Sequence, residues 1–477
     1  MSDSDIRLEL IMNKEVELRK TALETLIQIE KNNSPSHLVL KDVLDKFDYL
    51  SKTEKALIST IVKGTIERKI ELDYVADLFS KTPHNKMKMP IRIIIEMGIY
   101  QILYMKSYDT LAVNSSVELA RKKGFSTLAG FVNAVLRNVS RNKENIKYPE
   151  KGDENYLSVK YSMPQNLVNL LLSQYEFETV EKMLKASLES DFVRIRIKED
   201  NKESDGKAGS DKCEISGSNK EEIAVSKKDK ILDELKEKGA EITKVKGFDN
   251  LYNIKGMGNI SDFKSFTDGK IYIQDVGSYM LVMNVPFGER ILDTCSAPGG
   301  KSIFLSERYP EAKITACDIS EEKVSKIKEN IERCQASNIE VKICDATVFN
   351  PEFEEAFDVV VADVPCSGLG VIGKKQDIKY RLTDESLESL YELQRNIIDN
   401  VSKYVKKGGY LCYSTCTVNK KENEEQIERL LAEGRFECFE LSFVPDNMKE
   451  RAKNGSLSLM QGIDDSDGFF ISVLKKK

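Results

Sequence analysis

The segment ILDTCSAPGGKS, residues 291–302, joins a short apolar strand to a helix through a turn that contains two adjacent glycines. Gly299 and Gly300 allow a tight turn and a close approach of the backbone to a ligand. The segment is not a phosphate-binding GxxxxGK[ST] loop, because Cys295 stands where that loop needs its first glycine, and it is not a GxGxxG loop. It therefore predicts a strand–turn–helix unit that binds a ligand without a phosphate tail.

Strands and helices alternate in the sequence that follows this turn. Three of the predicted strands each end in an aspartate: Asp318, Asp345 and Asp363, in chain order. Such alternation predicts a parallel, doubly wound sheet, and ligands of these sheets bind at the carboxyl ends of the strands. We therefore expect an α/β Rossmann-like domain over residues 286–477.

The first two acids favour a particular class of cofactor. Asp318 lies 18 residues past Gly300, where an acid commonly accepts hydrogen bonds from ribose hydroxyls, and Asp345 is placed to meet an adenine amino group. This pattern favours an adenosine such as S-adenosylmethionine (SAM), and a plain strand–helix turn is the alternative. The expected cofactor contacts are Cys295, Ser296, Ala297, Pro298, Gly299, Gly300, Lys301, Asp318, Asp345 and Asp363.

Two cysteines follow the ends of strands that should be neighbours: Cys366 in ADVPCSGLG and Cys416 in YSTCTVN. A lone cysteine at a strand end is usually a packing residue. Two of them beside Asp363 at the expected ligand-binding edge instead favour covalent catalysis, because a thiolate is accessible near neutral pH. The C-terminal half has no histidine, which excludes a Ser-His-Asp triad there.

Length and composition indicate the number of domains and exclude several classes of protein. At about 150 residues per domain, 477 residues correspond to about three domains. The nine cysteines form no CxxC pair and only two histidines are present, so we expect neither a zinc site nor a disulfide framework. The most apolar stretch, Ile91–Met105, is too short to span a bilayer, and no export signal precedes it. We therefore expect a cytoplasmic protein that binds no metal and no membrane.

Residues 1–145 are expected to form an all-α domain. Apolar residues recur at helical spacing in seven segments, and Ser51 precedes Glu54 in a capping-box pattern. No acid, base and nucleophile are grouped in these segments, which favours a packing or binding module. The net charge is −6, but the basic run Arg121–Lys123 could contact RNA phosphates; a solvated helix face is the alternative.

Residues 146–285 are expected to form a small α+β domain. The sequence FVRIRI at 192–197 alternates apolar and basic residues, as a strand does. Residues 199–229 are rich in Lys, Glu, Asp, Gly and Ser and poor in apolar residues, so a disordered insertion is expected there. A helix is expected from Ile231 onward.

The C-terminal motifs resemble those of the NOL/NOP/Sun family of RNA cytosine-C5 methyltransferases. The resemblance rests on APGGK at 297–301, DVPCSG at 363–368, STC at 414–416 and DGFF at 467–470. The N-terminal helices resemble the NusB RNA-binding fold, and both parts on one chain resemble the 16S ribosomal RNA methyltransferases of the RsmB/Sun type. The resemblance implies a class I methyltransferase fold, SAM as cofactor, and 16S rRNA, naked or in an early assembly intermediate, as partner. The polar insertion departs from the family pattern.

The resemblance also implies roles for the two cysteines. Carbon 5 of cytosine is a poor nucleophile, and addition of a thiolate to carbon 6 makes it reactive toward a methyl group. RNA enzymes of this family use the cysteine of Ser-Thr-Cys, so Cys416 is expected to attack and Cys366 to help product release. Asp363 is expected to hold the N3 and amino edge of the base. Lys301 is expected to contact the target or to orient Asp363, and a solvated lysine is its alternative.

Two other functions remain open at this point. A tRNA cytosine-C5 methyltransferase of the same family would share the motifs, although the NusB-like helices disfavour it. A non-catalytic RNA-binding factor would not need Cys366, Cys416 and Asp363. DNA methylation is disfavoured because a Glu-Asn-Val element and a large target-recognition region are absent from the sequence. We therefore expect a monomeric, SAM-dependent 16S rRNA cytosine-C5 methyltransferase.

Overall fold

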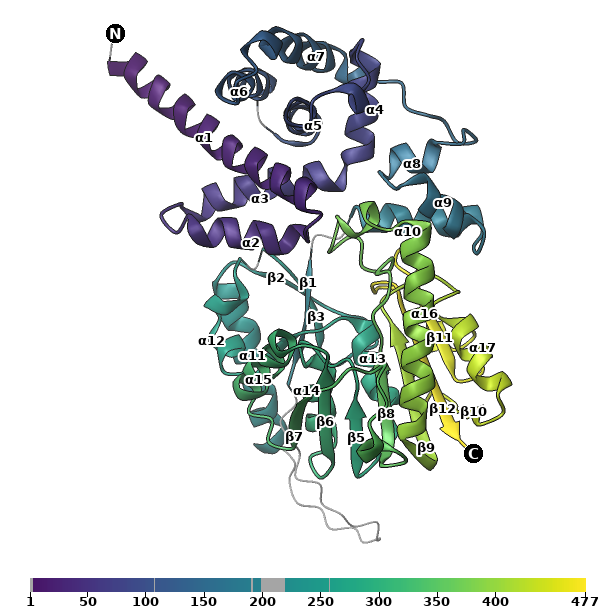
Figure 1. Cartoon of the computed structure of the whole chain (residues 1–477). Coiled ribbons are helices and arrows are strands. Elements are labelled where there is room, and N and C mark those ends of the chain that lie inside the picture. The colour runs from purple at the N-terminus through teal and green to yellow at the C-terminus, as the bar shows by residue number, and fades with distance from the viewer. Residues whose placement is uncertain (1–2, 107, 190–191, 199–218, 257) are drawn as a thin grey trace. The chain divides into compact units, whose positions relative to one another are not determined.

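The computed structural model describes residues 3–106, 108–189, 192–198, 219–256 and 258–477 (Figure 1). The chain divides into two compact units. A helical unit comprises Met1–Glu189 and Ile372–Asp384, and a sheet unit comprises Ser190–Val371 and Glu385–Lys477. This division differs from the three consecutive domains expected from the sequence.

Seven helices build the first part of the helical unit. Their apolar faces form one core, which includes Leu23, Ile61 and Ile94. The predicted capping box is confirmed, because Ser51 Oγ accepts a hydrogen bond from the Glu54 N–H and the Glu54 carboxylate accepts one from the Ser51 N–H. The helices are α1 (Asp3–Asn32), α2 (Ser36–Lys46), α3 (Lys52–Glu67), α4 (Lys69–Phe79), α5 (Met89–Tyr104), α6 (Asp109–Lys122) and α7 (Ala129–Asn142).

Three shorter helices and one distant segment complete this unit. Ser162, between two of these helices, accepts a hydrogen bond from the Ile70 N–H of α4 at 2.9 Å. In the segment 372–384, Lys379 Nζ donates to the Glu67 carbonyl of α3 at 2.8 Å. The expected boundary at residue 145 therefore lies inside the helical unit. The shorter helices are α8 (Tyr156–Lys160), α9 (Gln165–Leu172) and α10 (Phe177–Ser187).

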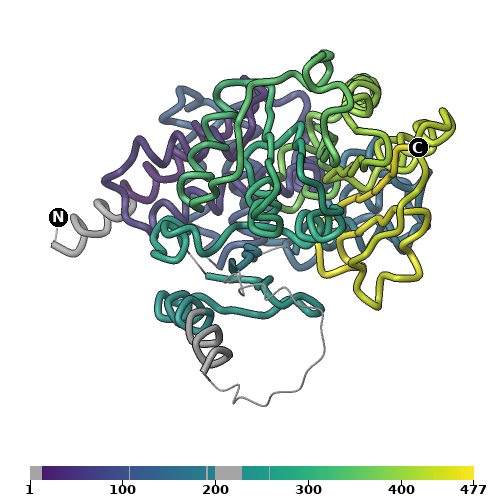
Figure 2. The backbone as a smooth tube through the Cα atoms, turned by 90° about the horizontal axis from the view of Figure 1, so that it is seen from below, coloured from purple at the N-terminus to yellow at the C-terminus, as the bar shows by residue number. Residues whose placement is uncertain are grey.

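A small antiparallel sheet opens the sheet unit. Its strand order is β2-β3-β1-β4, and α11 (Asn219–Glu237) runs beside it in Figure 2. The α+β character of this region agrees with the sequence analysis, although α11 begins twelve residues before the expected start at Ile231. The rest of the expected insertion, 199–218, lies outside the described residues. The strands are β1 (Val193–Ile197), β2 (Glu241–Lys244), β3 (Leu251–Lys255) and β4 (Ile271–Ile273), with α12 (Lys264–Thr267) before β4.

The large sheet has the strand order β10-β12-β9-β8-β5-β6-β7, and β11 pairs with β12. The run from β7 to β9 is parallel, as predicted, whereas β10, β11 and β12 are antiparallel and make the sheet mixed. The strands are β5 (Arg290–Asp293), β6 (Lys313–Asp318), β7 (Ile339–Ile343), β8 (Phe357–Asp363), β9 (Val405–Thr415), β10 (Phe436–Cys438), β11 (Ser456–Leu459) and β12 (Phe469–Lys476).

Helices cover both faces of this sheet, which confirms the doubly wound arrangement. One apolar core packs α13 and α14 against the strands, and a second core packs α16 and α17 against the opposite face. The carboxyl ends of β5 to β9 meet along one edge, so the predicted site residues gather there. The helices are α13 (Val276–Asn284), α14 (Gly300–Arg308), α15 (Glu321–Cys334), α16 (Asp384–Val401) and α17 (Glu424–Ala432).

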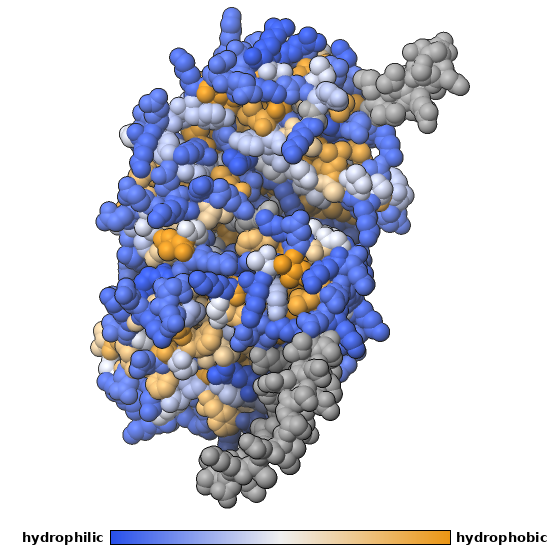
Figure 3. Space-filling view, turned by 180° about the vertical axis from the view of Figure 1, so that it is seen from behind, coloured by the Kyte–Doolittle hydropathy of each residue, from blue (hydrophilic) through white to orange (hydrophobic). Residues whose placement is uncertain are grey.

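The face of the molecule in Figure 3 is mainly polar. Polar residues cover most of the face in Figure 3, and apolar residues form separate small patches on it. Within the described ranges, no helix combines the length and the apolar character needed to cross a bilayer.

Candidate active site

The glycine turn after β5 is fixed by buried hydroxyl groups. Ser302, on α14, donates to Asp293 at 2.6 Å, and its hydroxyl lies 2.8 Å from that of Ser296 in the turn. Gly299 has φ 101°, a left-handed conformation that other residues adopt only with strain. A Cβ on Gly300 would lie 2.7 Å from the Tyr272 ring. The shape of the turn therefore requires both glycines.

Asp318 connects this turn to the end of β6. Its carboxylate accepts hydrogen bonds from the Ala297 N–H at 2.9 Å and the Ile319 N–H at 2.8 Å. Lys323 forms an ion pair with it at 2.9 Å. Asp318 is nearly buried, so the turn and the strand end hold its carboxylate in a fixed position.

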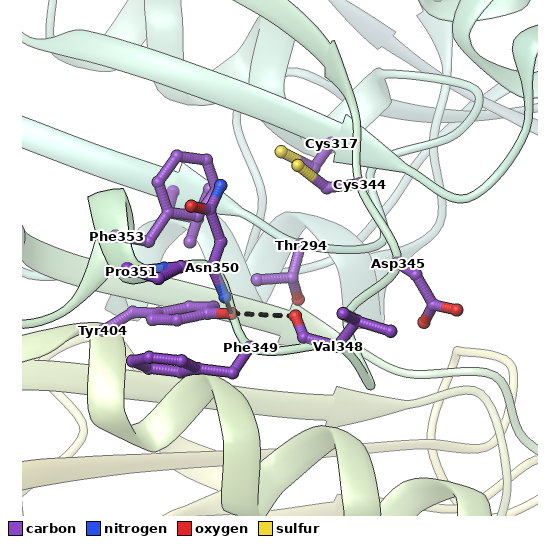
Figure 4. Close-up of a pocket in the computed structure, with 12 residues that line it drawn as sticks. Thr294, Cys317, Cys344, Asp345, Val348, Phe349, Asn350, Pro351, Phe353 and Tyr404 are labelled. Atoms are coloured by element: carbon purple, nitrogen blue, oxygen red, sulfur yellow. Dashed lines mark hydrogen bonds between the residues drawn. The ribbon is translucent and has the colours of Figure 1, made fainter.

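A cavity of about 350 Å³ opens next to the ends of β5, β6 and β7 (Figure 4). Phe349 and Tyr404 stack on one side of it, with ring centroids 5.9 Å apart. The Tyr404 hydroxyl accepts from the Asn350 N–H at 2.8 Å and donates to the Val348 carbonyl at 3.1 Å, so it holds the chain that follows β7. The lining residues are Leu292, Thr294, Cys317, Cys344, Asp345, Ala346, Val348, Phe349, Asn350, Pro351, Phe353 and Tyr404.

Of the ten expected cofactor contacts, Asp345 is the one that lines this cavity. One of its carboxylate oxygens accepts from the Thr347 N–H and hydroxyl, at 2.9 and 2.7 Å, in a local turn. The aromatic wall was not predicted. The sequence signal that could have revealed this wall is the pair Val348–Phe349, two apolar residues that follow a strand end. Both side chains are exposed in the structure.

Lys301, Asp363 and Ser414 form a chain of contacts across three elements. Lys301 Nζ lies 2.5 Å from one oxygen of Asp363, and the Ser414 hydroxyl donates to the other oxygen at 2.6 Å. Burial alone would lower the pKa of Lys301, but the charge of Asp363 and the hydrogen bond to it raise this pKa. Lys301 is therefore a cation bonded to Asp363, and the interpretation as a solvated lysine is wrong.

The two predicted cysteines lie in contact. Their Sγ atoms are 3.2 Å apart, and the Cys416 N–H donates to Cys366 Sγ at 3.3 Å. The hydrogen bond to Cys416, followed by burial, raises the pKa of Cys366. A coulombic interaction with Cys416 also raises the pKa of Lys301, so the two side chains interact electrostatically. By contrast, burial raises the pKa of Cys295 to about 12, which makes that thiol unreactive.

The structure thus brings Lys301, Asp363, Cys366 and Cys416 together. It places Asp318 at the end of β6, where its carboxylate bonds the turn that precedes Lys301. A pair of nucleophilic sulfur atoms beside a cation and a carboxylate can support covalent catalysis with proton transfer. In the described part of the chain, no cluster of His, Cys, Asp and Glu could hold a metal ion. Sequence analysis missed Glu422, a buried carboxylate bonded to the residue that follows each cysteine.

Comparisons with known proteins match two separate parts of the chain. A family model described as 16S rRNA methyltransferase RsmB/F matches residues 280–475, and a NusB family model matches residues 16–141. The chain is 31% identical over 474 residues to the probable ribosomal RNA small subunit methyltransferase B of Bacillus subtilis (strain 168), covering 97% of this chain and 100% of that protein. It is 27% identical to the ribosomal RNA small subunit methyltransferase B of Klebsiella pneumoniae, covering 98% and 100%.

Solved structures share the fold. The protein PH0851 superposes with a TM-score of 0.74 at 21% identity, covering 97% of this chain and 98% of its own. NSun6 from Pyrococcus horikoshii, solved with SFG, has a TM-score of 0.52 at 20% identity, covering 66% of this chain and 98% of its own.

Proposed function

Since this chain belongs to the family of the ribosomal RNA small subunit methyltransferases B, the RsmB/Sun family, we propose that it methylates carbon 5 of a cytidine in 16S rRNA, with SAM as the methyl donor. The observation that carries the proposal is the contact between Cys366 and Cys416 beside the Lys301–Asp363 pair. Methylation of an exocyclic amine or a ribose would not need two adjacent thiols.

The residues around the glycine turn suit an adenosine. The cavity beside the stacked rings of Phe349 and Tyr404 offers an apolar, aromatic wall for a flat ring, with Asp345 in its lining for an amino group. Asp318 is fixed by backbone donors and is placed to accept hydrogen bonds from ribose hydroxyls. Backbone from Cys295 to Gly300 would line the rest of the ligand. Bound SAM would supply an electrophilic methyl group.

Each thiol would serve one step. The Cys416 thiolate adds to carbon 6 of the cytosine, and carbon 5 then takes the methyl group, which leaves SAM as its thioether. The bond between carbon 6 and the Cys416 sulfur then breaks, and the Cys366 thiol gives its proton to that sulfur while it takes the proton from carbon 5, which restores the aromatic base. Asp363 holds the N3 and amino edge of the base, and Lys301 orients Asp363.

The electrostatics of the site support Cys416 as the nucleophile. A thiolate is favoured by a nearby cation, and Lys301 interacts electrostatically with Cys416. The raised pKa of Cys366 favours its thiol form, and this thiol can donate to Cys416 Sγ at 3.2 Å. The same assignment follows from the family's use of the Ser-Thr-Cys cysteine.

A denaturing gel of each variant with SAM and 16S rRNA tests the two roles. Cys416→Ser should lose methylation and form no covalent RNA adduct. Cys366→Ala should still attack and transfer the methyl group but release poorly, so a slow-migrating protein–RNA band should accumulate. The asymmetry arises because addition precedes elimination, and a block at the later step traps what the earlier step made.

Cys438, an exposed cysteine outside the site, provides the matched control, and Cys438→Ser should behave as the wild type. An adduct with Cys416→Ser and none with Cys366→Ala would reverse the two roles. Retained methylation in both variants without any adduct would remove covalent catalysis.

A further inference from the structure

Glu422 lies at the centre of a buried hydrogen-bond network between the two cysteine loops. It precedes α17, and its side chain is fully buried. One carboxylate oxygen accepts from the Ser367 N–H at 2.8 Å and from Gln394 at 2.9 Å, and the other accepts from the Ser367 hydroxyl at 2.6 Å. These donors, a backbone N–H, a hydroxyl and a side-chain amide, are all neutral groups.

The network joins the residues that directly follow the two cysteines. Ser367 follows Cys366, and Thr417 follows Cys416. The hydroxyls of Ser367 and Thr417 are 2.8 Å apart, and that of Thr417 also donates to Glu422 at 3.3 Å. One carboxylate therefore sets the spacing between the two loops.

The side chain of the next residue, Asn423, bonds the loop that contains Cys416. Its amide oxygen accepts from the Thr415 hydroxyl at 2.5 Å, and its amide nitrogen donates to the Thr417 carbonyl at 3.0 Å. Gln394, which donates to Glu422, also donates to the Pro365 carbonyl just before Cys366, at 3.0 Å. Hydrogen bonds thus hold the residue before and the residue after each cysteine.

We propose that Glu422 is a positioning residue that sets the contact between the two cysteines and keeps Cys366 in its thiol form, which leaves Cys416 as the group that attacks. This inference rests on the proposed cytosine methylation. The hydrogen bond to Cys416, burial and the electrostatic interaction with Cys416 raise the pKa of Cys366 most, and the electrostatic interaction with Glu422 raises it further. The two cysteines differ in their surroundings. The Glu422 carboxylate bonds the residue that follows Cys366, whereas the Lys301 ammonium interacts electrostatically with Cys416.

The first test measures ionisation without any substrate. Glu422→Gln keeps the shape of the side chain and removes its charge. In a Cys416→Ser background, alkylation of Cys366 by iodoacetamide is followed against pH by mass spectrometry of the peptide that contains it. We expect Glu422→Gln to lower the midpoint of this alkylation by about one pH unit. Glu424→Gln is the matched control, since Glu424 bonds Ser458 and neither cysteine loop, and it should leave the midpoint unchanged.

The second test separates position from charge. Thr417→Val removes the hydroxyl that bridges Ser367 and Glu422 but keeps the carboxylate charge. It should leave the alkylation midpoint unchanged and lower kcat for RNA methylation at least tenfold, with KM for SAM unchanged because the cofactor cavity is not touched. Glu422→Gln should lower kcat as well. Because Thr417→Val tests the network independently, the proposal stays testable if circular dichroism shows that Glu422→Gln does not fold.

The outcomes distinguish this inference from the proposed function. An unchanged midpoint in a folded Glu422→Gln protein overturns the electrostatic role, and an unchanged kcat with Thr417→Val overturns the positioning role. A wild-type protein that transfers no methyl group to cytosine carbon 5 overturns the proposed function, whereas a lowered midpoint in Glu422→Gln would still establish the effect of Glu422 on Cys366.

Discussion

Among the single residues, Asp318 gives the sharpest prediction for the cofactor. Its carboxylate is fixed by the N–H groups of Ala297 and Ile319 and remains able to accept further hydrogen bonds. Leaving buried ribose hydroxyls without an acceptor costs about 1–3 kcal/mol. Asp318→Ala should therefore weaken SAM binding about tenfold to a hundredfold, as measured by isothermal titration calorimetry.

The control for this prediction is Glu322→Gln, which changes an exposed acid in the first turn of α15. Its affinity for SAM should equal that of the wild type. An unchanged affinity in Asp318→Ala would show that the ribose does not bind at the end of β6. The far-ultraviolet circular dichroism of both variants should match that of the wild type.

Some residues of the site could be predicted from the sequence and others could not. Asp363, Cys366 and Cys416 could be predicted because each lies at a strand end, where parallel strands bring such residues together. Glu422 could not be predicted in this way, because it lies in a loop and acts through the backbone and hydroxyl of Ser367. Such contacts depend on how two loops fold against each other.

At the level of elements, most long helices and the strands from β5 to β9 follow from apolar periodicity and alternation. The short strands β3 and β11 were not predicted, because they lie outside the strand–helix alternation that marks β5 to β9. The segment 372–384 was not assigned to the helical unit, because its partners lie about 220 to 340 residues away in sequence. Asp377, for example, accepts from the Ser36 hydroxyl at 2.6 Å.

This segment carries a pH-dependent group. Lys379 is fully buried, and burial lowers its pKa to about 7. The unfolded chain keeps the proton up to the ordinary lysine value of about 10.4. The unfolded state therefore binds more protons between these two values, and the free energy of unfolding rises with pH across that window by up to about 1.4 kcal/mol per pH unit.

Replacing Lys379 by Met should remove this contribution. Urea denaturation followed by circular dichroism at pH 7, 8 and 9 should show a smaller rise of stability with pH in Lys379→Met than in the wild type. Lys41→Met, on the exposed face of α2, should keep the wild-type slope. Equal slopes in all three proteins would show that Lys379 stays charged in the folded state.

The whole molecule has a net charge of −6, so attraction to RNA has to come from local groups of cations. The run Arg121–Lys123 was one candidate. In the structure, Lys122 pairs with Glu17 at 2.7 Å and Lys123 with Glu24 at 2.9 Å, so both lysines connect α6 to α1. Arg121 pairs with Glu118 at 3.3 Å on its own helix. The solvated-face alternative is incomplete, because Lys122 and Lys123 contact acids of α1.

These ion pairs give a prediction for RNA binding that differs from the one a free basic run would give. Removing one cation that binds a phosphate should flatten the slope of log Kobs against log salt by about 0.7–0.9. Because Lys122 and Lys123 already have acidic partners, Lys122→Gln with Lys123→Gln should flatten the slope by less than the effect of one such cation, measured by filter binding of a 16S rRNA fragment. Glu17→Gln with Glu24→Gln should instead steepen it, since both lysines then face phosphates without a competing acid. A slope flattened by the full effect of two cations in the lysine variant would mean that both lysines leave α1 for the RNA backbone when the complex forms.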